Sequence, residues 1–176
     1  MISNLQRKKV RLIVLTYDHI DHAENAAYLS NRLQVPIAIH PEEMELIETP
    51  QTQTLHSNGM MGTILLRMSN CNQNIRVTPF TPTVLLRDND TLKKFGINAT
   101  IIHLSGHTNG SIEIDIDNTY LVAGDTLMNI VYSCASLLYT DKQALRQSCN
   151  KIYSLGNRTV YFGHGRPAKN KTWTVT

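Results

Sequence analysis

Apolar and polar segments follow one another along the chain in an order typical of alternating strands and helices. The run RLIVLT at residues 11–16 is rich in apolar and β-branched side chains and predicts a buried strand that ends where a polar stretch begins. Residues 23–33 carry apolar side chains at helical spacing, and VPIAIH at 35–40 predicts a second strand. Pro41 and the acids after it are typical of a helix start, because proline suits the first helical position and acids suit the positive end of the helix dipole. The first part of the chain is therefore predicted to be β-α-β-α.

Strands outnumber helices in the second half of the chain. Residues 99–104, 111–116 and 119–124 have the patterns of strands, and the turn-like IDNT between the last two predicts a hairpin. RTVYFGHG at residues 158–165 predicts a last strand that runs into a histidine between two glycines. The hairpin predicts that at least two of these strands pair directly.

A further helix is predicted over residues 140–155, where TDKQALRQSCNKIYSL is amphipathic. Thr140 or Asp141 can serve as its N-cap, and Gly156 lies just past its end, where glycine commonly terminates a helix. Residues 50–75 have weak periodicity, and no element is predicted there.

Length and element order predict one domain over residues 1–176 with a mixed α/β (α+β) fold. A chain of 176 residues can bury a sizeable core, whereas two full domains would be a tight fit. Hydrophobic residues at 41% and charged residues at 18% are ordinary for a globular protein, so we expect the whole chain to fold.

Composition and charge exclude several classes of partner. The net charge of +3 is scattered and forms no concentrated basic face, so no nucleic-acid partner is expected. No apolar stretch approaches the roughly 20 residues that span a bilayer, and no apolar signal segment opens the chain, so we expect a cytoplasmic protein without membrane contact. Cys71, Cys134 and Cys149 lack C-x-x-C spacing, which argues against a disulfide framework and a cysteine zinc site.

Histidine and aspartate side chains follow the ends of several predicted strands. Such residues can converge on one site although they lie far apart in the sequence. Neutral imidazole and carboxylate groups are the ligands that zinc and similar divalent ions take when no thiolate is present, and a catalytic site leaves a position open for water. The candidate metal ligands are His19, Asp21, His22, His107, Asp125 and His164.

Each candidate ligand also has a purely structural explanation. Asp21 or His22 could cap the helix that follows, because aspartate in particular is a good N-cap. His107 and Asp125 could be turn residues, and His164 could stabilise a loop between two glycines. Taken singly, these explanations are at least as good as a metal role, but their coincidence at strand ends favours a shared site.

Four short motifs resemble, in their order and spacing, those of the metallo-β-lactamase superfamily. TYDHIDH at residues 16–22 resembles the signature T-H-x-H-x-D-H with its first histidine replaced by Tyr17, and SGHTNGS at 105–111 is similar to P-G-H-T-P-G-S. VAGDTL at 122–127 resembles the G-D-x-L segment, and YFGHGRP at 161–167 resembles the terminal P-G-H-G-x-P. The resemblance covers most of the chain and implies the αββα sandwich of that family.

The resemblance also implies two metal sites that share one carboxylate. A first ion would be held by His19 and His107, a second by Asp21, His22 and His164, and Asp125 would bridge the two. We expect one or two divalent ions, zinc before iron or manganese.

Tyr17 stands where the resemblance implies a third protein ligand for the first ion. A phenol is mostly protonated at neutral pH and is a poorer ligand than imidazole unless the metal itself removes its proton. The second site is therefore expected to be complete and the first to be weakened. An aromatic side chain without any metal role is the alternative explanation of Tyr17.

The function that the resemblance implies is hydrolysis of a small molecule by metal-activated water. A bound divalent ion can bring the pKa of water from 15.7 to about 7, and Asp21, the candidate catalytic residue, would orient that water or accept its proton. GHTNGS and AGDTL resemble the glyoxalase-II-like and general hydrolase branches, which suggests a small ester, thioester or lactone as substrate. A catalytically degenerate protein that binds metal or a partner without turnover is the alternative, and redox chemistry at a diiron site is a third.

The N-terminal part is short for this family. Its members ordinarily carry several strands before the metal-binding loop, whereas about ten residues precede RLIVLT. We therefore expect a sandwich that lacks its N-terminal strands and exposes an apolar sheet edge, unless the sequence is a truncated one. A homo-oligomer, a swapped element or a partner chain could cover that edge.

Overall fold

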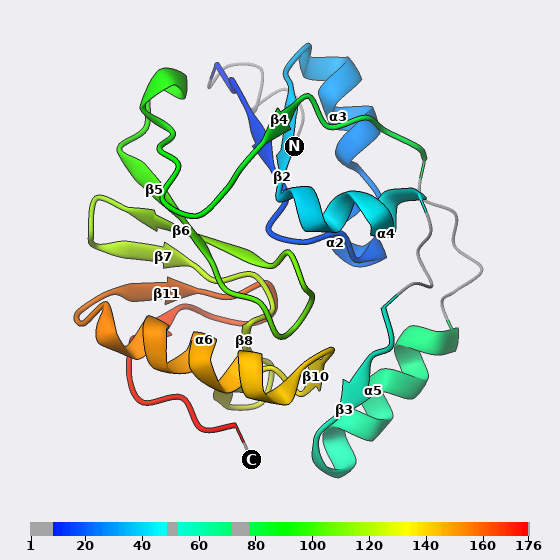
Figure 1. Cartoon of the computed structure of the whole chain (residues 1–176), viewed down its shortest axis with the longest axis vertical. Coiled ribbons are helices and arrows are strands. Elements are labelled where there is room, and N and C mark those ends of the chain that lie inside the picture. Colours follow the sequence, from blue (N-terminus) through cyan, green and yellow to red (C-terminus); the bar gives the residue numbers. More distant parts are fainter. Residues whose placement is uncertain (1–8, 49–52, 72–77, 176) are drawn as a thin grey trace.

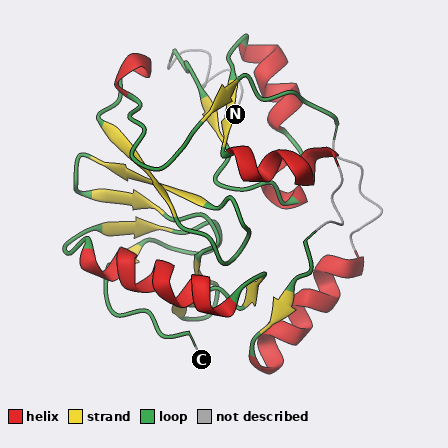
Figure 2. Cartoon of the chain, viewed as in Figure 1, coloured by secondary structure: helices red, strands yellow, loops and turns green. Residues whose placement is uncertain are grey.

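Two main β-sheets pack face to face between two layers of helices (Figures 1 and 2), and two further pairs of short strands, β3 (His56–Ser57) with β10 (Leu138–Tyr139) and β8 (Leu127–Asn129) with β9 (Ser133–Ala135), lie outside them. The structure is a computed structural model and describes residues 9–48, 53–71 and 78–175. The layer order is helix, sheet, sheet, helix, which confirms the α/β class predicted from the sequence. None of the helices in the described ranges combines the length and the apolar character needed to cross a membrane.

A parallel three-stranded sheet comes from the first half of the chain. Its strands are β1 (Ile13–Val14), β2 (Ile37–Ile39) and β4 (Val84–Leu85), in the order β1-β2-β4. Among the described residues, β1 has β2 as its single strand neighbour. The helical segments beside this sheet are α2 (Ile20–Ala23), α3 (Ala26–Leu33), the 3-10 turn η1 (Pro41–Glu43) and α4 (Met44–Glu48).

A five-stranded sheet comes from the second half. Its order is β12 (Ala168–Lys169), β11 (Thr159–Tyr161), β7 (Tyr120–Val122), β6 (Ile112–Ile116) and β5 (Ala99–His103). Only the β11–β7 pair is parallel within it. The predicted hairpin joins β6 to β7, and Asp117 and Asn118 at its tip take left-handed backbone angles with φ of 52° and 48°, which short polar side chains tolerate.

Apolar side chains fill the space between the layers. Ile101 and Ile112, at 0% and 1% exposure, lie between the two sheets, while Leu145 and Ile152 of α6 (Lys142–Ser154) pack on the outer face of the larger sheet. Each such side chain contributes roughly 1.5–3 kcal/mol through burial. The packing therefore fixes the strand ends from which the candidate ligands emerge.

The predicted last helix corresponds to α6. Asp141 is its N-cap and accepts hydrogen bonds from the backbone N–H groups of Gln143 at 2.7 Å and Ala144 at 2.9 Å. Gly156 follows its last turn with φ of 76°. Of the two N-cap candidates, the structure selects Asp141 over Thr140.

Several elements differ from the sequence prediction. The strand predicted at 11–16 is reduced to Ile13–Val14, and the helix predicted at 23–33 is shortened to α3, with the separate turn α2 before it. Helix α5 (Gly59–Cys71) was not predicted, because apolar side chains such as Met60 and Met68 are exposed on it and leave no clear buried stripe. The remaining short elements are β3 (His56–Ser57), η2 (Lys93–Phe95), β8 (Leu127–Asn129), β9 (Ser133–Ala135) and β10 (Leu138–Tyr139).

Candidate metal centre

The first candidate loop leads from β1 into the single turn of α2. His19 precedes that turn with an extended backbone, and its carbonyl oxygen accepts hydrogen bonds from the backbone N–H groups of His22 at 3.0 Å and Ala23 at 2.9 Å. Asp21 and His22 lie inside α2, and neither caps α2 or α3 with its side chain. The explanation of these two residues as N-caps is therefore wrong.

Four candidate side chains from three separate segments come together beside this turn. Nε2 of His164 lies 3.0 Å from Oδ2 of Asp21 and 3.4 Å from Oδ2 of Asp125. Nε2 of His22 lies 3.7 Å from Oδ2 of Asp21 and 3.8 Å from Oδ1 of Asp125. Ligand bonds of about 2.0–2.2 Å around a tetrahedral ion place ligand atoms roughly 3–4 Å apart. One ligand atom each of Asp21, His22 and His164 lies within 4.8 Å of the other two, which suits one cation, and Asp125 adjoins both histidines.

The other two candidate ligands meet next to this group, and Tyr17 packs against both of them. The ring centroids of His19 and His107 are 4.9 Å apart. The Tyr17 ring lies 4.9 Å from that of His19, 4.8 Å from that of His107 and 4.4 Å from that of His22. All six sequence-predicted ligands thus form one contiguous cluster, and Tyr17 packs at its centre.

The surroundings of His107 leave its Nε2 atom ready for a ligand. Nδ1 lies 2.9 Å from the carbonyl oxygen of Leu138 and 3.0 Å from Oγ of Ser136. A carbonyl oxygen can only accept, so Nδ1 donates to it, and Nε2 is the ring nitrogen left for a ligand. Nε2 is buried without a hydrogen-bond partner, and the same holds for Oδ1 of Asp125. Buried polar atoms are normally paired, so both atoms fit a site that a cation completes.

The histidines beside Tyr17 are held in the form that binds metals. Burial lowers the pKa of His19 well below its usual 6.5, and the neighbouring His107 and His22 lower it further. Burial also lowers the pKa of His22, although Asp125 and Asp21 oppose the change. Both imidazoles are therefore neutral at pH 7, as ligation requires.

The phenol of Tyr17 is the departure from the expected ligand set. Its side chain is 1% exposed, and burial raises its pKa well above the usual 10, with the charges of Asp125 and Asp21 acting in the same direction. The hydroxyl lies near the Asp125 carboxylate but has no hydrogen bond of good geometry. In the absence of a cation, the phenol keeps its proton.

A buried glutamate that the sequence analysis did not single out connects the two loops that carry His19 and His107. Oε2 of Glu43 accepts a hydrogen bond of 2.9 Å from the backbone N–H of Asp18, and Oε1 accepts one of 2.7 Å from that of Gly110. Burial, and then the charge of Glu43, raise the pKa of Asp18 to about 7. No motif marks Glu43, because its role depends on two distant backbone segments.

Gly163 is a second residue that the sequence analysis missed. A Cβ atom at this position would overlap Oδ1 of Asp125 and lie 2.7 Å from Cε1 of His22. Only glycine therefore lets the strand that leads to His164 pass this close to the other ligands. The glycine beside the candidate histidine was visible in the sequence, but its contact with Asp125 was not.

Asn129 at the end of β8 fixes the loop of His164. Its backbone N–H donates a hydrogen bond of 2.9 Å to the carbonyl oxygen of His164, and its side-chain amide donates one of 2.6 Å to the carbonyl oxygen of Arg166. The three residues that follow it have exposed apolar side chains: Ile130 at 54%, Val131 at 76% and Tyr132 at 65%. Strands β8 and β9 pair antiparallel, so the His164 loop is tied to the base of the exposed hairpin that they form.

A second group of ligand-type side chains is poorly suited to a metal. The rings of His40 and His103 are stacked with centroids 4.1 Å apart, and Glu42 lies beside them. Nδ1 of His40 accepts the backbone N–H of Glu42 at 3.3 Å, and Nε2 of His103 lies 2.8 Å from the carbonyl oxygen of Asn109. These bonds already occupy one nitrogen of each ring.

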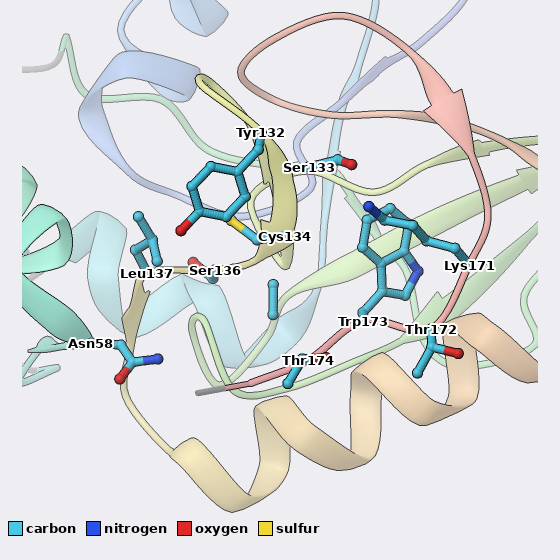
Figure 3. Close-up of a pocket in the computed structure, with 11 residues that line it drawn as sticks. Asn58, Tyr132, Ser133, Cys134, Ser136, Leu137, Lys171, Thr172, Trp173 and Thr174 are labelled. Atoms are coloured by element: carbon cyan, nitrogen blue, oxygen red, sulfur yellow. The ribbon is translucent and has the colours of Figure 1, made fainter.

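A separate cavity of about 230 Å³ lies between the β9 segment and the C-terminal residues (Figure 3). Cys134, Ser136, Lys171 and Trp173 are among its lining residues, and none of the six candidate ligands lines it. Ser136 links the two places, because its Oγ contacts Nδ1 of His107. The cavity therefore adjoins Ser136, which contacts the candidate ligand His107, and the ligands themselves do not line it.

The chain is similar to curated proteins of mycobacteria. It is 27% identical over 161 residues to the uncharacterized protein Rv2581c of Mycobacterium tuberculosis, a match that covers 87% of this chain and 68% of that protein. The same identity is found over 157 residues with the uncharacterized protein ML0493 of Mycobacterium leprae. Because both proteins are uncharacterized, the similarity gives no information on the activity of this chain.

Solved structures share the fold. The BLEG-1 B3 metallo-beta-lactamase superposes with a TM-score of 0.70 at 23% identity, covering 96% of this chain and 77% of that one. TTHA1623 in a di-iron-bound form superposes with a TM-score of 0.66 at 24% identity, covering 90% and 71%. The family model described as the metallo-beta-lactamase superfamily matches residues 1–164. The chain therefore belongs to the metallo-beta-lactamase superfamily.

Proposed function

We propose that this protein is a metal-dependent hydrolase that uses metal-activated water on a small ester, thioester or lactone, as in the glyoxalase-II-like branch that its motifs resemble. One observation carries the proposal. Six imidazole and carboxylate side chains from four segments form one cluster, in which Nε2 of His107 and Oδ1 of Asp125 are buried without partners. Superfamily membership supports the fold of a metal-dependent hydrolase and does not specify the substrate.

The complete donor set would hold the principal ion. His22 and His164 supply two imidazoles, and each lies within hydrogen-bonding or ion-pair distance of the carboxylates of both Asp21 and Asp125. Bound there, a divalent ion lowers the pKa of water from 15.7 to about 7 and polarises a carbonyl group. Zinc is the metal proposed first, and iron and manganese are the alternatives.

The two carboxylates are proposed to have different tasks because their exposures differ. The Asp21 side chain is 56% exposed, so water and a substrate carbonyl can reach it from solvent. Asp21 orients the attacking water and accepts its proton. The Asp125 side chain is 9% exposed and serves as a fixed anion between His22 and His164.

A catalytically degenerate protein is the second candidate, and Tyr17 is the observation that favours it. The Tyr17 ring packs against both His19 and His107, where it would exclude an ion from that half of the cluster. Such a protein would bind metal or a partner without turnover. Redox chemistry at a diiron site is the third candidate, because TTHA1623, which shares the fold, was solved in a di-iron-bound form. Iron in the purified protein would favour this candidate.

Metal analysis combined with a panel of thioester, ester and lactone substrates tests the proposal. We expect hydrolysis well above that of the free ion, and His22→Ala should abolish it while lowering the metal content. His56→Ala is the matched control, because His56 is an exposed histidine on β3 outside the cluster.

Bound metal with no hydrolysis above that of the free ion, together with no effect of His22→Ala on any activity, would establish the degenerate alternative. A protein without metal, whose hydrolysis His22→Ala and His56→Ala leave equal, would overturn both.

A further inference from the structure

The cavity between the β9 segment and the C-terminal residues has the size and the lining of a small-molecule site (Figure 3). Its volume is about 230 Å³, and an engineered cavity of about 150 Å³ holds benzene. Two of its lining residues, Ser136 and Trp173, are buried at 1% and 4% exposure, whereas Lys171 is exposed. The cavity therefore reaches from an exposed rim to buried side chains and has room for a small organic molecule.

Lys171 brings a positive charge to this cavity. Among the described residues, no carboxylate forms an ion pair with its ammonium group, which lies 5.2 Å from the centroid of the Trp173 ring. Burial raises the pKa of the Cys134 thiol, which also lines the cavity, and the charge of Lys171 only opposes this change. The thiol therefore stays neutral and supplies no counter-charge.

Ser136 adds a hydrogen-bond donor among the buried lining residues. Nδ1 of His107 donates to the carbonyl oxygen of Leu138, so Oγ of Ser136, at 3.0 Å from the same nitrogen, can only accept from it. Oγ also accepts the backbone N–H of Leu138 at 3.4 Å. The hydroxyl hydrogen of Ser136 then has no acceptor within the described ranges, and a buried donor without an acceptor is costly. An acceptor group in the cavity would satisfy it.

Apolar residues complete the lining, namely Ala135, Leu137 and Trp173. We propose that the cavity binds a small organic carboxylate, with the Lys171 ammonium as its counter-charge and the Ser136 hydroxyl as a hydrogen-bond donor. The apolar lining favours an organic acid over an inorganic anion, because it gains from covering an apolar body. The six metal ligands do not line this site, so the inference goes beyond the proposed function and does not depend on hydrolysis.

Trp173 reports on the cavity directly, because it is the only tryptophan of the chain. Its indole Nε1–H donates a hydrogen bond of 2.9 Å to Oδ1 of Asn170 and gives a single indole signal in the NMR spectrum of the full chain. We expect sodium benzoate to shift this signal saturably. Benzamide, which has the same shape without the charge, should bind roughly tenfold more weakly. Inorganic phosphate should leave the signal in place.

Lys171→Met should weaken benzoate binding roughly tenfold, because a charge-assisted contact is lost. Lys169→Met is the matched control, since it removes the same charge from an exposed lysine on β12 that does not line the cavity, and it should bind benzoate as the wild type does.

Three results would each overturn the proposal: no shift at tens of millimolar benzoate, equal binding of benzoate and benzamide, or equal binding of benzoate to the two lysine variants. An equal shift with inorganic phosphate would overturn the assignment to an organic acid. A benzoate shift that His22→Ala abolishes and Lys171→Met leaves unchanged would place benzoate at the metal centre instead. Absence of hydrolysis, with benzoate binding as expected, would count against the proposed function alone.

Discussion

The side chain of Glu43 accepts a hydrogen bond of 2.7 Å from the backbone N–H of Gly110, which lies 67 positions further along the chain. The other carboxylate oxygen accepts the backbone N–H of Asp18. One buried side chain therefore holds the loop before His19 and the loop after His107 at a fixed separation. The ligands of the proposed centre depend on it although it contacts none of them through a hydrogen bond.

We predict that Glu43→Gln destabilises the fold and loosens both loops. The amide of glutamine has one acceptor oxygen, so one backbone N–H is left facing an NH₂ group, at a cost of about 1–3 kcal/mol. Chemical denaturation should show this loss, and hydrogen exchange should increase at Asp18 or Gly110. Glu42→Gln is the control, because the neighbouring Glu42 is exposed and its replacement should leave the free energy of unfolding within about 0.5 kcal/mol. Equal stability of the two variants would contradict the role assigned to Glu43.

Gly163→Ala is predicted to impair metal binding more than folding. The added methyl group overlaps Oδ1 of Asp125, so the carboxylate must move away from His22 and His164. Overpacking of this kind costs about 1–3 kcal/mol, and displaced ligand support costs roughly 10–100-fold in metal affinity. Zinc titration of the metal-free protein measures the effect.

Gly156→Ala provides the comparison for Gly163→Ala. Gly156 has φ of 76°, and a methyl group added there would meet no atom within 4 Å, so alanine strains the end of α6 without reaching the ligands. Zinc affinity should then be unchanged although stability falls. If both variants bind zinc as tightly as the wild type does, the close contact between Gly163 and Asp125 does not affect metal binding.

The group that contains His164 should have a higher affinity for zinc than the group that contains His107 and Tyr17. His164→Ala removes a ligand from the group that also contains Asp21, His22 and Asp125, whereas His107→Ala removes one from the group with the phenol. We expect the zinc content after dialysis to fall further in His164→Ala. Elemental analysis of both variants settles the order, and equal losses would show that Tyr17 does not weaken its half for zinc.

Stability should fall as the pH rises because of Glu113. This carboxyl group is fully buried on β6, neither oxygen has a hydrogen bond of good geometry, and burial raises its pKa well above the usual 4.5. Below pH 4.5 the folded and unfolded chains both carry the proton, and the contribution of Glu113 is fully present. Above it the unfolded chain ionises first, so stability is lost at up to about 1.4 kcal/mol per pH unit until the folded pKa is passed.

Glu113→Gln removes this titration and should therefore become more stable relative to the wild type between pH 5 and pH 7. Urea denaturation with a chelator present throughout measures the difference. The exposed Glu24→Gln serves as control and should follow the wild type at every pH. A difference between Glu113→Gln and wild type that stays constant with pH would show that Glu113 ionises in the folded protein.

The sequence predicted the larger sheet and the candidate ligands better than the supports around them. The apolar residues of strands β5 to β7 and of helix α6 recur at periods of two and 3.6 residues, and these same residues are buried in the structure. His22, Asp125 and His164 lie in motifs with recognisable spacing. Helix α5 was missed because its apolar side chains face outward, so its pattern has no relation to a core.

The supports could not be predicted, because each depends on the close approach of segments far apart in the chain. Leu138 accepts the proton of His107 through its backbone carbonyl, which any residue type offers. The carboxylate of Glu43 is one of several in an acidic stretch, and only the folded chain shows which one meets Gly110. Thr108 and Ser111 carry hydroxyl groups close to His107 in the sequence, but these two groups bond to each other at 2.7 Å.

In the proposed hydrolase, the hydrogen bond between Asn129 and His164 connects the exposed hairpin to the metal centre. A substrate acyl chain that lay across Ile130, Val131 and Tyr132 would contact the residues that directly follow β8. Asn129 of β8 donates the hydrogen bond to the His164 carbonyl. Substrates that differ only in the length of an aliphatic tail should then differ in turnover as well as in affinity. Selectivity in this protein would arise at the far end of the substrate, away from the bond that is cleaved.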